Sequence, residues 1–305
     1  MIFLKAQGRL GNQLFQYAFV KHLSKQYNQK ICINFERVRK KSKKKGDGWE
    51  NGLKYFNIYD YEEIYYSQYQ YMWVWIKLKL VRFLINSVKN NDQHGEKFGV
   101  IYCYEPKKQH FQYINRNNII VDGLFEYSYI VDDVIDELRK ELFKYNFATE
   151  KNNELYKKIL LDNSICVTVR KFDMEDPKFT DFYQKCSIEY YHRGIQYIIN
   201  KHPNANIIVF SDQIDWCKNN LKLEDKFPDI DITYETHNNE LNEKMQMMSK
   251  CSHYVISNST FSWWVQKLSQ RKGKEKIVCA PIRWNDKYLT KDIGLYCPEW
   301  ILLEN

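Results

Sequence analysis

The sequence opens with MIFLKAQGRLGNQLFQY, residues 1–17, where an apolar run meets a helix-patterned segment through a turn that contains Gly8 and Gly11. The apolar run has the length of a short buried strand, and Leu14–Gln26 repeats apolar side chains at helical spacing. A second strand-like run, KICINF, follows at residues 30–35. This order of strand, helix and strand is the usual opening of a doubly wound α/β domain.

The polar residues of the opening turn allow two interpretations. In the structural one, the glycines shape the backbone and Asn12 caps the helix. In the functional one, Arg9, Asn12 and Gln13 donate hydrogen bonds to a sugar or an acceptor. We favour the functional interpretation, because polar turns also end strands in the second half of the chain, so that the opening turn would form one wall of a cleft between two domains.

Three apolar runs in the second half each stop at a polar turn. ICVTV (165–169) runs into RKFD, NIIVF (206–210) into SDQ, and HYVIS (253–257) into NST. Helix-patterned segments follow the last two turns, so the right-handed crossover rule makes the strands parallel and brings their turns to one edge of one sheet. We therefore expect an α/β protein, and its 305 residues are a soft prior for two domains.

The net charge of +8 is unevenly distributed, because ERVRKKSKKK, residues 36–45, holds seven basic residues in ten. Arg37–Lys45 either meets phosphates or an anionic membrane, or is a solvated loop. Little aromatic interleaving argues against a nucleic-acid partner. A second segment, YMWVWIKLKLVRFLI (71–85), is too short and too charged to span a bilayer. It predicts a basic amphipathic helix that packs on the core or rests on a membrane surface, and we favour core packing.

Cysteine and histidine usage indicates the cellular compartment and whether a metal ion is bound. Eight cysteines are scattered without a C-x-x-C pair, which indicates buried thiols in a reducing compartment. The N-terminus has no signal-peptide pattern, so we expect a cytoplasmic protein that is either free or peripheral at the inner face of the membrane. Seven dispersed histidines and a D-x-D pattern at Asp229–Asp231 in a strand-like stretch give no convincing metal set, and we expect no metal and no cofactor.

The turn NSTFSWW, residues 258–264, has the features of an anion site. Asn258 or Ser259 is placed as the N-cap of a helix, where backbone N–H groups, hydroxyls and the positive end of the helix dipole gather. Such a motif alone is more often structural. Arg170, at the end of the neighbouring predicted strand, strengthens the functional interpretation, because its guanidinium can grip a phosphate in two places. Together these residues predict a diphosphate site.

Three carboxylates follow the same strands. Asp212 either caps its own helix or accepts hydrogen bonds from the Watson–Crick edge of a guanine, which presents donors that adenine does not. Asp173 and Asp176 are the carboxylates nearest in sequence to Arg170. Either is a general base or an ion-pair partner.

Three motifs, GRLGNQLFQYAFVKHL, FSDQIDWCKNNL and SNSTFSWWVQKLS, occur in an order and at a separation that resemble the α-1,2-fucosyltransferases, the family of bacterial O-antigen enzymes and blood-group H transferases. The resemblance implies a GT-B fold of two Rossmann-like domains facing a cleft, with the acceptor side in residues 1–155 and the sugar nucleotide in residues 156–305. It also implies an inverting, metal-independent transfer of L-fucose from GDP-fucose to the 2-hydroxyl of a galactoside, within an oligosaccharide or a lipid-linked glycan.

The resemblance also assigns roles to residues of this chain. Arg170 falls on the phosphate-binding arginine and Asp212 in the guanine-side turn. The donor-binding loop comprises Asn258, Ser259, Thr260, Phe261 and Ser262. The loop beside the transferred sugar comprises Arg9, Gly11, Asn12 and Gln13. In the transfer reaction, Arg170 would stabilise the departing diphosphate and Asp173 would act as the base.

One stretch departs from the family's pattern. Where the family has His-x-Arg-Arg-Gly-Asp-Tyr, residues 168–174 are TVRKFDM, so Lys171 replaces a bidentate arginine and Phe172 replaces a glycine. The departure leaves two alternatives open. The same fold would use another GDP-deoxyhexose such as GDP-colitose, or the chain would be a non-catalytic nucleotide- or glycan-binding protein.

Overall fold

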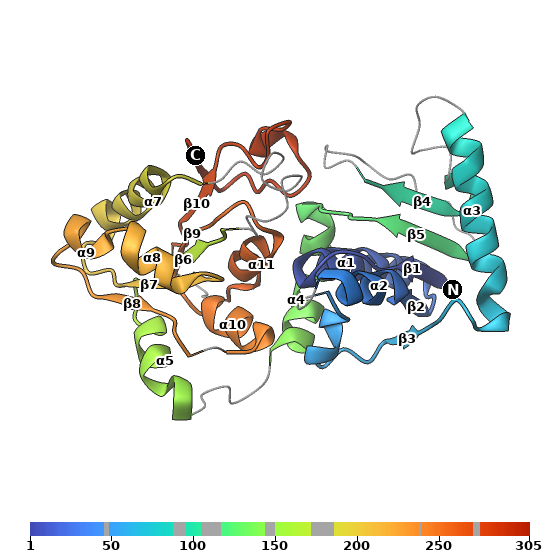
Figure 1. The fold of residues 1–305 in the computed structure, drawn as a ribbon, viewed down its shortest axis with the longest axis horizontal. Coiled ribbons are helices and arrows are strands. Elements are labelled where there is room, and N and C mark those ends of the chain that lie inside the picture. Colours follow the sequence, from blue (N-terminus) through green and yellow to red (C-terminus); the bar gives the residue numbers. More distant parts are fainter. Residues whose placement is uncertain are drawn as a thin grey trace. The chain divides into compact units, whose positions relative to one another are not determined.

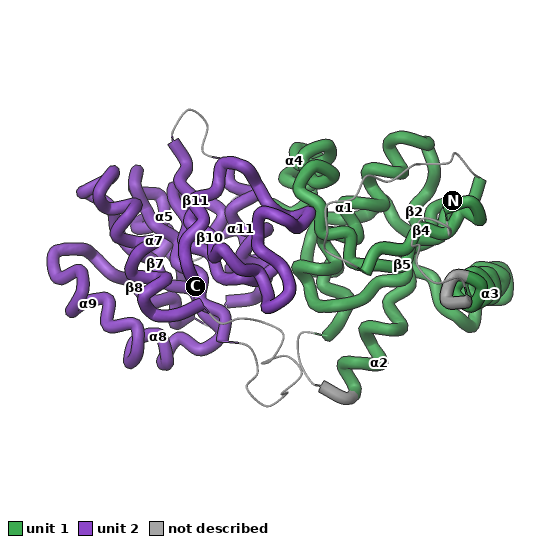
Figure 2. Tube along the Cα trace, turned by 90° about the horizontal axis from the view of Figure 1, so that it is seen from above, with its two compact units in different colours: residues 1–143 green, residues 144–305 purple. Residues whose placement is uncertain are grey.

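The computed structural model describes residues 1–45, 49–87, 96–104, 117–143, 150–171, 186–237, 239–270 and 275–305. The chain divides into two compact units, unit 1 from Met1 to Phe143 and unit 2 from Lys144 to Asn305 (Figure 2). Each unit is built on one parallel sheet, which confirms the expected fold class (Figure 1). The division falls ahead of the expected boundary at residue 155, so that α5 (Asn153–Ile159) belongs to unit 2.

Unit 1 holds a five-stranded sheet of order β3-β2-β1-β5-β4, in which every pair is parallel. Its strands are β1 (Ile2–Lys5), β2 (Ile31–Asn34), β3 (Tyr61–Glu63), β4 (Val100–Cys103) and β5 (Ile119–Gly123). Its helices are α1 (Leu10–Tyr27), α2 (Glu36–Lys45), α3 (Met72–Ser87) and α4 (Ser128–Leu142), with short 3-10 helices η1 (Gly52–Tyr55) and η2 (Tyr69–Tyr71). The expected opening of strand, helix and strand is confirmed.

Apolar side chains of α1, α3 and the sheet build the core of unit 1. Phe3 of β1 and Ile120 of β5 are at most 1% exposed and pack with Val74 of α3. The amphipathic helix expected at residues 71–85 is thus α3, and its packing on the core is confirmed. α1 packs against α4, and Phe19 of α1 stacks on Phe125 with ring centroids 4.0 Å apart.

Unit 2 holds a six-stranded parallel sheet of order β11-β10-β9-β6-β7-β8. Its strands are β6 (Ile165–Val169), β7 (Ile207–Ser211), β8 (Ile232–Tyr234), β9 (His253–Val255), β10 (Val278–Pro281) and β11 (Ile301–Leu303). Its helices, besides α5, are α7 (Ile188–Lys201), α8 (Ile214–Asn220), α9 (Leu223–Lys226), α10 (Leu241–Met248) and α11 (Thr260–Leu268), with 3-10 helices η4 (Glu150–Asn152) and η5 (Thr290–Asp292).

Helix α7 is fixed closely to the sheet of unit 2. A Cβ on Gly194 would lie 2.7 Å from a methyl group of Val255, so only glycine permits this approach. The buried hydroxyl of Tyr190 lies 2.6 Å from the carbonyl oxygen of Ile256 and 3.1 Å from that of Cys279. These contacts hold the carboxyl ends of β9 and β10, and the NST turn follows β9.

The sequence also predicts buried thiols and no segment that spans a membrane. The eight cysteines are free thiols, and all except Cys186 are buried, as expected. Among the described helices, none has both the length and the apolar character needed to cross a membrane.

Candidate functional site

The polar turns of unit 2 lie at one edge of its sheet. β6 lies between β9 and β7, and the three strands are parallel, so their carboxyl ends share an edge. In this register Val169 is paired with Ser211, and Val167 with Val255. The convergence expected from the sequence is confirmed. Open α/β sheets bind their ligands at this edge.

Arg170 and Asp212 form an ion pair at the ends of β6 and β7. An Nη of Arg170 lies 2.8 Å from an Oδ of Asp212, and the other Oδ accepts the backbone N–H of Lys171 at 3.2 Å. The interpretation of Asp212 as a helix cap is wrong, because Gln213 is the N-cap of α8 and donates its N–H to the Ser211 hydroxyl at 2.9 Å. Both oxygens of Asp212 are engaged by the Arg170 strand end, which does not favour a guanine contact in this conformation.

Helix α11 begins where the sequence places it. Ser259 is its N-cap and Thr260 its first residue. The hydroxyl of Ser262 lies 3.0 Å from that of Ser257, and Asn258 donates to the carbonyl oxygen of Trp284 at 3.0 Å. Asn258 and Ser262 are therefore buried residues that hold the turn.

The residues that face outward from this turn are Ser259, Thr260 and Phe261, which are partly exposed. They lie in the first turn of a helix, where backbone N–H groups have no partner within the helix and the dipole is positive. The turn is fixed to β6, because the N–H of Ser257 donates to the buried Thr168 hydroxyl at 3.0 Å. Arg170 follows Thr168 by two residues, and Ser259 follows Ser257 by two residues. Both therefore lie at the same edge of the sheet, after neighbouring strands.

The segment with the altered motif is described only in part. Lys171 places its ammonium 3.5 Å from the centroid of the Trp216 ring, so this residue, which replaces the family's second arginine, is held on α8. Asp173 and Asp176 lie outside the described residues. The assignment of Asp173 as the base therefore stays a prediction.

In unit 1, the turn between β1 and α1 does not use the helix cap that the structural interpretation expects. Arg9 is the N-cap of α1, so the expectation that Asn12 caps this helix is wrong. Gly8 has φ +79°, and a Cβ there would lie 2.6 Å from the Cβ of Asn12. Gly11 is buried in the first turn, and the guanidinium of Arg9 lies 5.7 Å from the centroid of the Trp49 ring.

The expectation that Gln13 donates a hydrogen bond to a sugar is not met in this conformation. Gln13 is 1% exposed, and its amide donates to the carbonyl oxygens of Gly8 at 3.0 Å and Glu50 at 2.7 Å. Its oxygen accepts the N–H of Gly52 at 2.8 Å. Both amide hydrogens are used inside the protein, so in this conformation Gln13 holds the segment around Gly52 against the turn.

Sequence reasoning missed Glu126, which follows β5 at the carboxyl edge of the unit 1 sheet. The amide of Asn12 donates to its carboxylate at 3.0 Å. Burial raises the pKa of Glu126 to about 7. Two signals were available: the strand-like run NNIIVDGLF stops directly before Glu126, and β5 and β1 are parallel neighbours, so both polar turns end at one edge.

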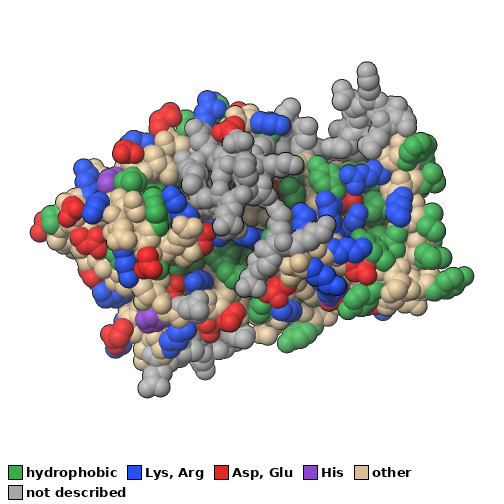
Figure 3. Space-filling model, in the orientation of Figure 1, with side chains coloured by type: hydrophobic (Ala, Val, Ile, Leu, Met, Phe, Trp, Pro, Cys, Tyr) green, Lys and Arg blue, Asp and Glu red, His purple; other side chains and the backbone are tan. Residues whose placement is uncertain are grey.

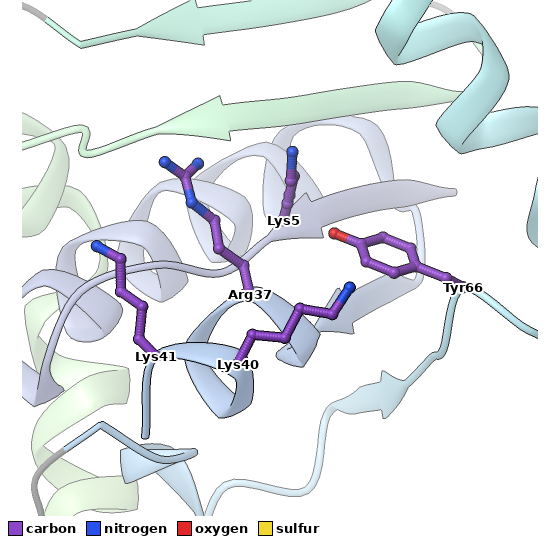
Figure 4. A pocket seen from close by; sticks show the side chains of 5 residues that line it. All are labelled: Lys5, Arg37, Lys40, Lys41 and Tyr66. Atoms are coloured by element: carbon purple, nitrogen blue, oxygen red, sulfur yellow. The ribbon is translucent and has the colours of Figure 1, made fainter. Parts of the chain in front are cut away.

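The basic run of residues 36–45 is not a solvated loop, because it forms α2. Arg37, Lys40 and Lys41 of this helix, with Lys5 of β1 and Tyr66, line a cavity of about 360 Å³ (Figure 4). Beneath them lies the carboxylate of Asp122, which is 0% exposed.

Asp122 is the counter-ion of this cavity. It lies 3.7 Å from both Lys5 and Arg37, and it accepts the hydroxyl of Tyr104. Burial lowers the pKa of Lys5, and Asp122 opposes that effect. With four cations around it and one buried carboxylate, the cavity has an excess of positive charge, which favours an anionic group.

Metal-ligating residues do not cluster in the described ranges: no group of three or more His, Cys, Asp or Glu there is suited to hold an ion. Asp231, in the D-x-D pattern, precedes β8 and forms an ion pair with Lys158 at 2.9 Å. This contact agrees with the structural interpretation of that pattern.

A model of Glycosyl transferase family 11 matches residues 1–304 of the chain. Two proteins of Escherichia coli are similar to it in sequence. The O-antigen biosynthesis glycosyltransferase WbnK is 26% identical over 309 residues, which cover 93% of this chain and 96% of the relative. An alpha-1,2-colitosyltransferase is 30% identical over 155 residues, which cover 50% of this chain and 51% of the relative.

A solved structure is similar over both units. It is that of an Arabidopsis thaliana FUT1 mutant in complex with GDP, with a TM-score of 0.54 and 12% sequence identity, covering 96% of this chain and 72% of that one. At this identity the likeness concerns the fold. It agrees with the two Rossmann-like domains that the motifs imply.

Proposed function

This chain belongs to glycosyl transferase family 11, and we propose that it transfers L-fucose from GDP-fucose to the 2-hydroxyl of a galactoside in a bacterial surface glycan. The transfer inverts the anomeric centre and needs no metal ion. The acceptor is a galactose-containing oligosaccharide or a lipid-linked glycan. Similarity to WbnK, a protein named for O-antigen biosynthesis, along most of both chains supports this class of acceptor.

One observation carries the proposal: Arg170 leaves β6 beside the start of α11, with its guanidinium held by Asp212 at 2.8 Å. A guanidinium and a helix N-terminus are two complementary ways to bind a diphosphate. Adjacent parallel strands place both at one edge. This pairing supports a nucleoside diphosphate sugar as the donor.

In the reaction, negative charge grows on the diphosphate as its bond to the anomeric carbon breaks. Arg170 and the first turn of α11 are charges and dipoles that stabilise this leaving group without reorganising. The acceptor oxygen bonds to the opposite face of the sugar, which inverts the centre, and a base takes the hydroxyl proton. Asp173 is one candidate for that base.

A second donor has specific support. The alpha-1,2-colitosyltransferase is 30% identical over half of this chain, and TVRKFDM at residues 168–174 departs from the family's arginine motif. GDP-colitose is therefore the alternative donor, with the same nucleotide and the same site. A non-catalytic nucleotide- or glycan-binding protein is the alternative from a different class.

The decisive experiment is mass spectrometry of the products formed from GDP-fucose or GDP-colitose on an array of galactose-containing glycans, with and without a chelator. Transfer of one deoxyhexose that survives the chelator supports the proposal. Melting temperature in the presence of GDP and UDP provides a parallel readout, since a ligand of the native state raises it. Stabilisation by UDP alone contradicts the nucleotide assignment, and GDP binding without transfer supports the non-catalytic alternative.

A further inference from the structure

Helix α3 is apolar on two sides. Its inner side chains, Val74, Trp75, Leu78 and Val81, are at most 8% exposed and belong to the core of unit 1. Its outer side also carries large apolar residues, which are between 40% and 69% exposed: Met72, Trp73, Ile76, Leu80, Phe83 and Leu84. Core packing explains the first set. In the second set, the Trp73 ring also packs edge-on against the ring of Phe3 in β1, with centroids 5.5 Å apart, and core packing leaves the exposure of the other five residues unexplained.

The outer residues form one continuous stripe. At about 100° per residue, all six fall within an arc of about 120° on the helix surface. Lys77 borders this arc on one side, and Lys79 and Arg82 lie on the other. Residues 72–87 contain no Asp or Glu. Figure 3 shows apolar side chains gathered along α3, with lysine and arginine beside them.

We propose that this outer face of α3 rests on an anionic lipid surface. Apolar side chains that enter the interface, with basic residues along their border, are the features of an interfacial helix. The positive border complements the negative charge of anionic headgroups. A second copy of the chain is less suited, because pairing two α3 stripes would bring like charges together without acidic partners.

The basic helix α2 is a weaker candidate for this contact than the sequence alone indicates. Arg37, Lys40 and Lys41 line the cavity beside Asp122, and Arg39 forms an ion pair with Glu63. Arg37, Arg39 and Lys41 thus have contacts within unit 1, whereas Lys40 is exposed. The membrane contact that the sequence predicts at Arg37–Lys45 stays a prediction, and our proposal places the contact at α3.

The test is co-sedimentation of the full chain with vesicles of phosphatidylcholine alone or with added phosphatidylglycerol, at low and high salt. We expect binding to the anionic vesicles that weakens with salt. The double variant Ile76→Glu/Leu80→Glu should reduce it at least tenfold. Leu160→Glu/Leu161→Glu is the matched control, since these two leucines of unit 2 are 49% and 52% exposed, and it should bind as the original chain does.

Three outcomes would overturn the proposal: no binding to anionic vesicles at millimolar lipid, an equal loss in the control variant, or unchanged binding in the α3 variant. A dimer in light scattering that Ile76→Glu/Leu80→Glu dissociates would assign the face to a second copy instead. The GDP-dependent melting temperature verifies that each variant is folded. None of these readouts depends on glycosyl transfer.

Discussion

The guanidinium of Arg170 lies 2.8 Å from the carboxylate of Asp212, across the ends of two neighbouring parallel strands. The side chains are 27% and 26% exposed, so the pair is neither a free surface pair nor a buried one. A planar guanidinium that is already oriented loses less freedom when it binds a phosphate. We therefore expect Asp212 to position Arg170 for the donor that we propose.

Removing the guanidinium should cost the most activity at this edge. We expect Arg170→Ala to lower kcat/KM by about 100- to 1,000-fold, as for loss of one preorganised donor to a developing anion. Arg170→Lys keeps the charge without the fork and should have an intermediate value. Arg193→Ala is the control, since that arginine of α7 donates to the carbonyl oxygen of Glu304 at 2.6 Å. Near-normal turnover in Arg170→Ala would remove this residue from the mechanism.

The positioning role of Asp212 can be separated from competition with the ligand. We expect Asp212→Asn to weaken GDP binding about tenfold and to lower the free energy of unfolding by less than about 1 kcal/mol, because the pair is partly solvated. Calorimetric titration with GDP and urea unfolding measure the two quantities. If GDP bound more tightly to the variant, Asp212 would be a competitor for Arg170.

Gly123 should be intolerant of any side chain. A Cβ at this end of β5 would overlap the backbone carbonyl of Cys103 on β4, and neither backbone can move without breaking the ladder. We expect Gly123→Ala to lower the free energy of unfolding by more than about 2 kcal/mol, as overpacking does. Urea unfolding checks this value. A loss below about 0.5 kcal/mol would contradict the close approach of β5 to β4 at this position.

Asp122 should be needed to hold the cationic cavity together. Its carboxylate is fully buried, and Lys5 and Arg37 both lie 3.7 Å away. Removing the charge leaves two cations in a partly desolvated place, so Asp122→Asn should cost about 2–4 kcal/mol of unfolding free energy. Adding Lys5→Met should recover part of that loss. Equal stability of Asp122→Asn and the original chain would show that solvent screens the cavity.

Local patterns predicted the elements of the site but not its partners. The apolar runs that became β6, β7 and β9, the start of α11 and the shared strand edge all follow from periodicity and connection rules. The Arg170–Asp212 pair joins residues 42 positions apart by number, and burial of Gln13 depends on a segment near Gly52. Such contacts are set by tertiary packing, which a single sequence does not display.

The surroundings of the basic run, residues 36–45, also depend on tertiary contacts that a single sequence does not display. Charge density at residues 36–45 favours a solvated or membrane-bound segment, yet α2 follows β2 directly and its Arg37 lies beside the buried carboxylate of Asp122. The outer stripe of α3 was visible in the sequence as an excess of apolar residues. Which side of α3 packs on the core could not be predicted from the sequence, because that depends on where the sheet lies.

The stability of unit 1 should depend on pH through Glu126. Its pKa is raised from 4.5 to about 7 by burial, so the folded chain binds the proton more tightly than the unfolded chain does. For a raised carboxyl pKa, this stabilisation is complete below pH 4.5, declines as pH rises through 7, and is absent above it. Relative to Glu126→Gln, the original chain should lose at most about 3 kcal/mol across that window, with the loss reduced by partial exposure of the side chain. Urea unfolding of both proteins from pH 4.5 to 8 measures the difference. A difference that is constant with pH would mean that the carboxyl group has an ordinary pKa.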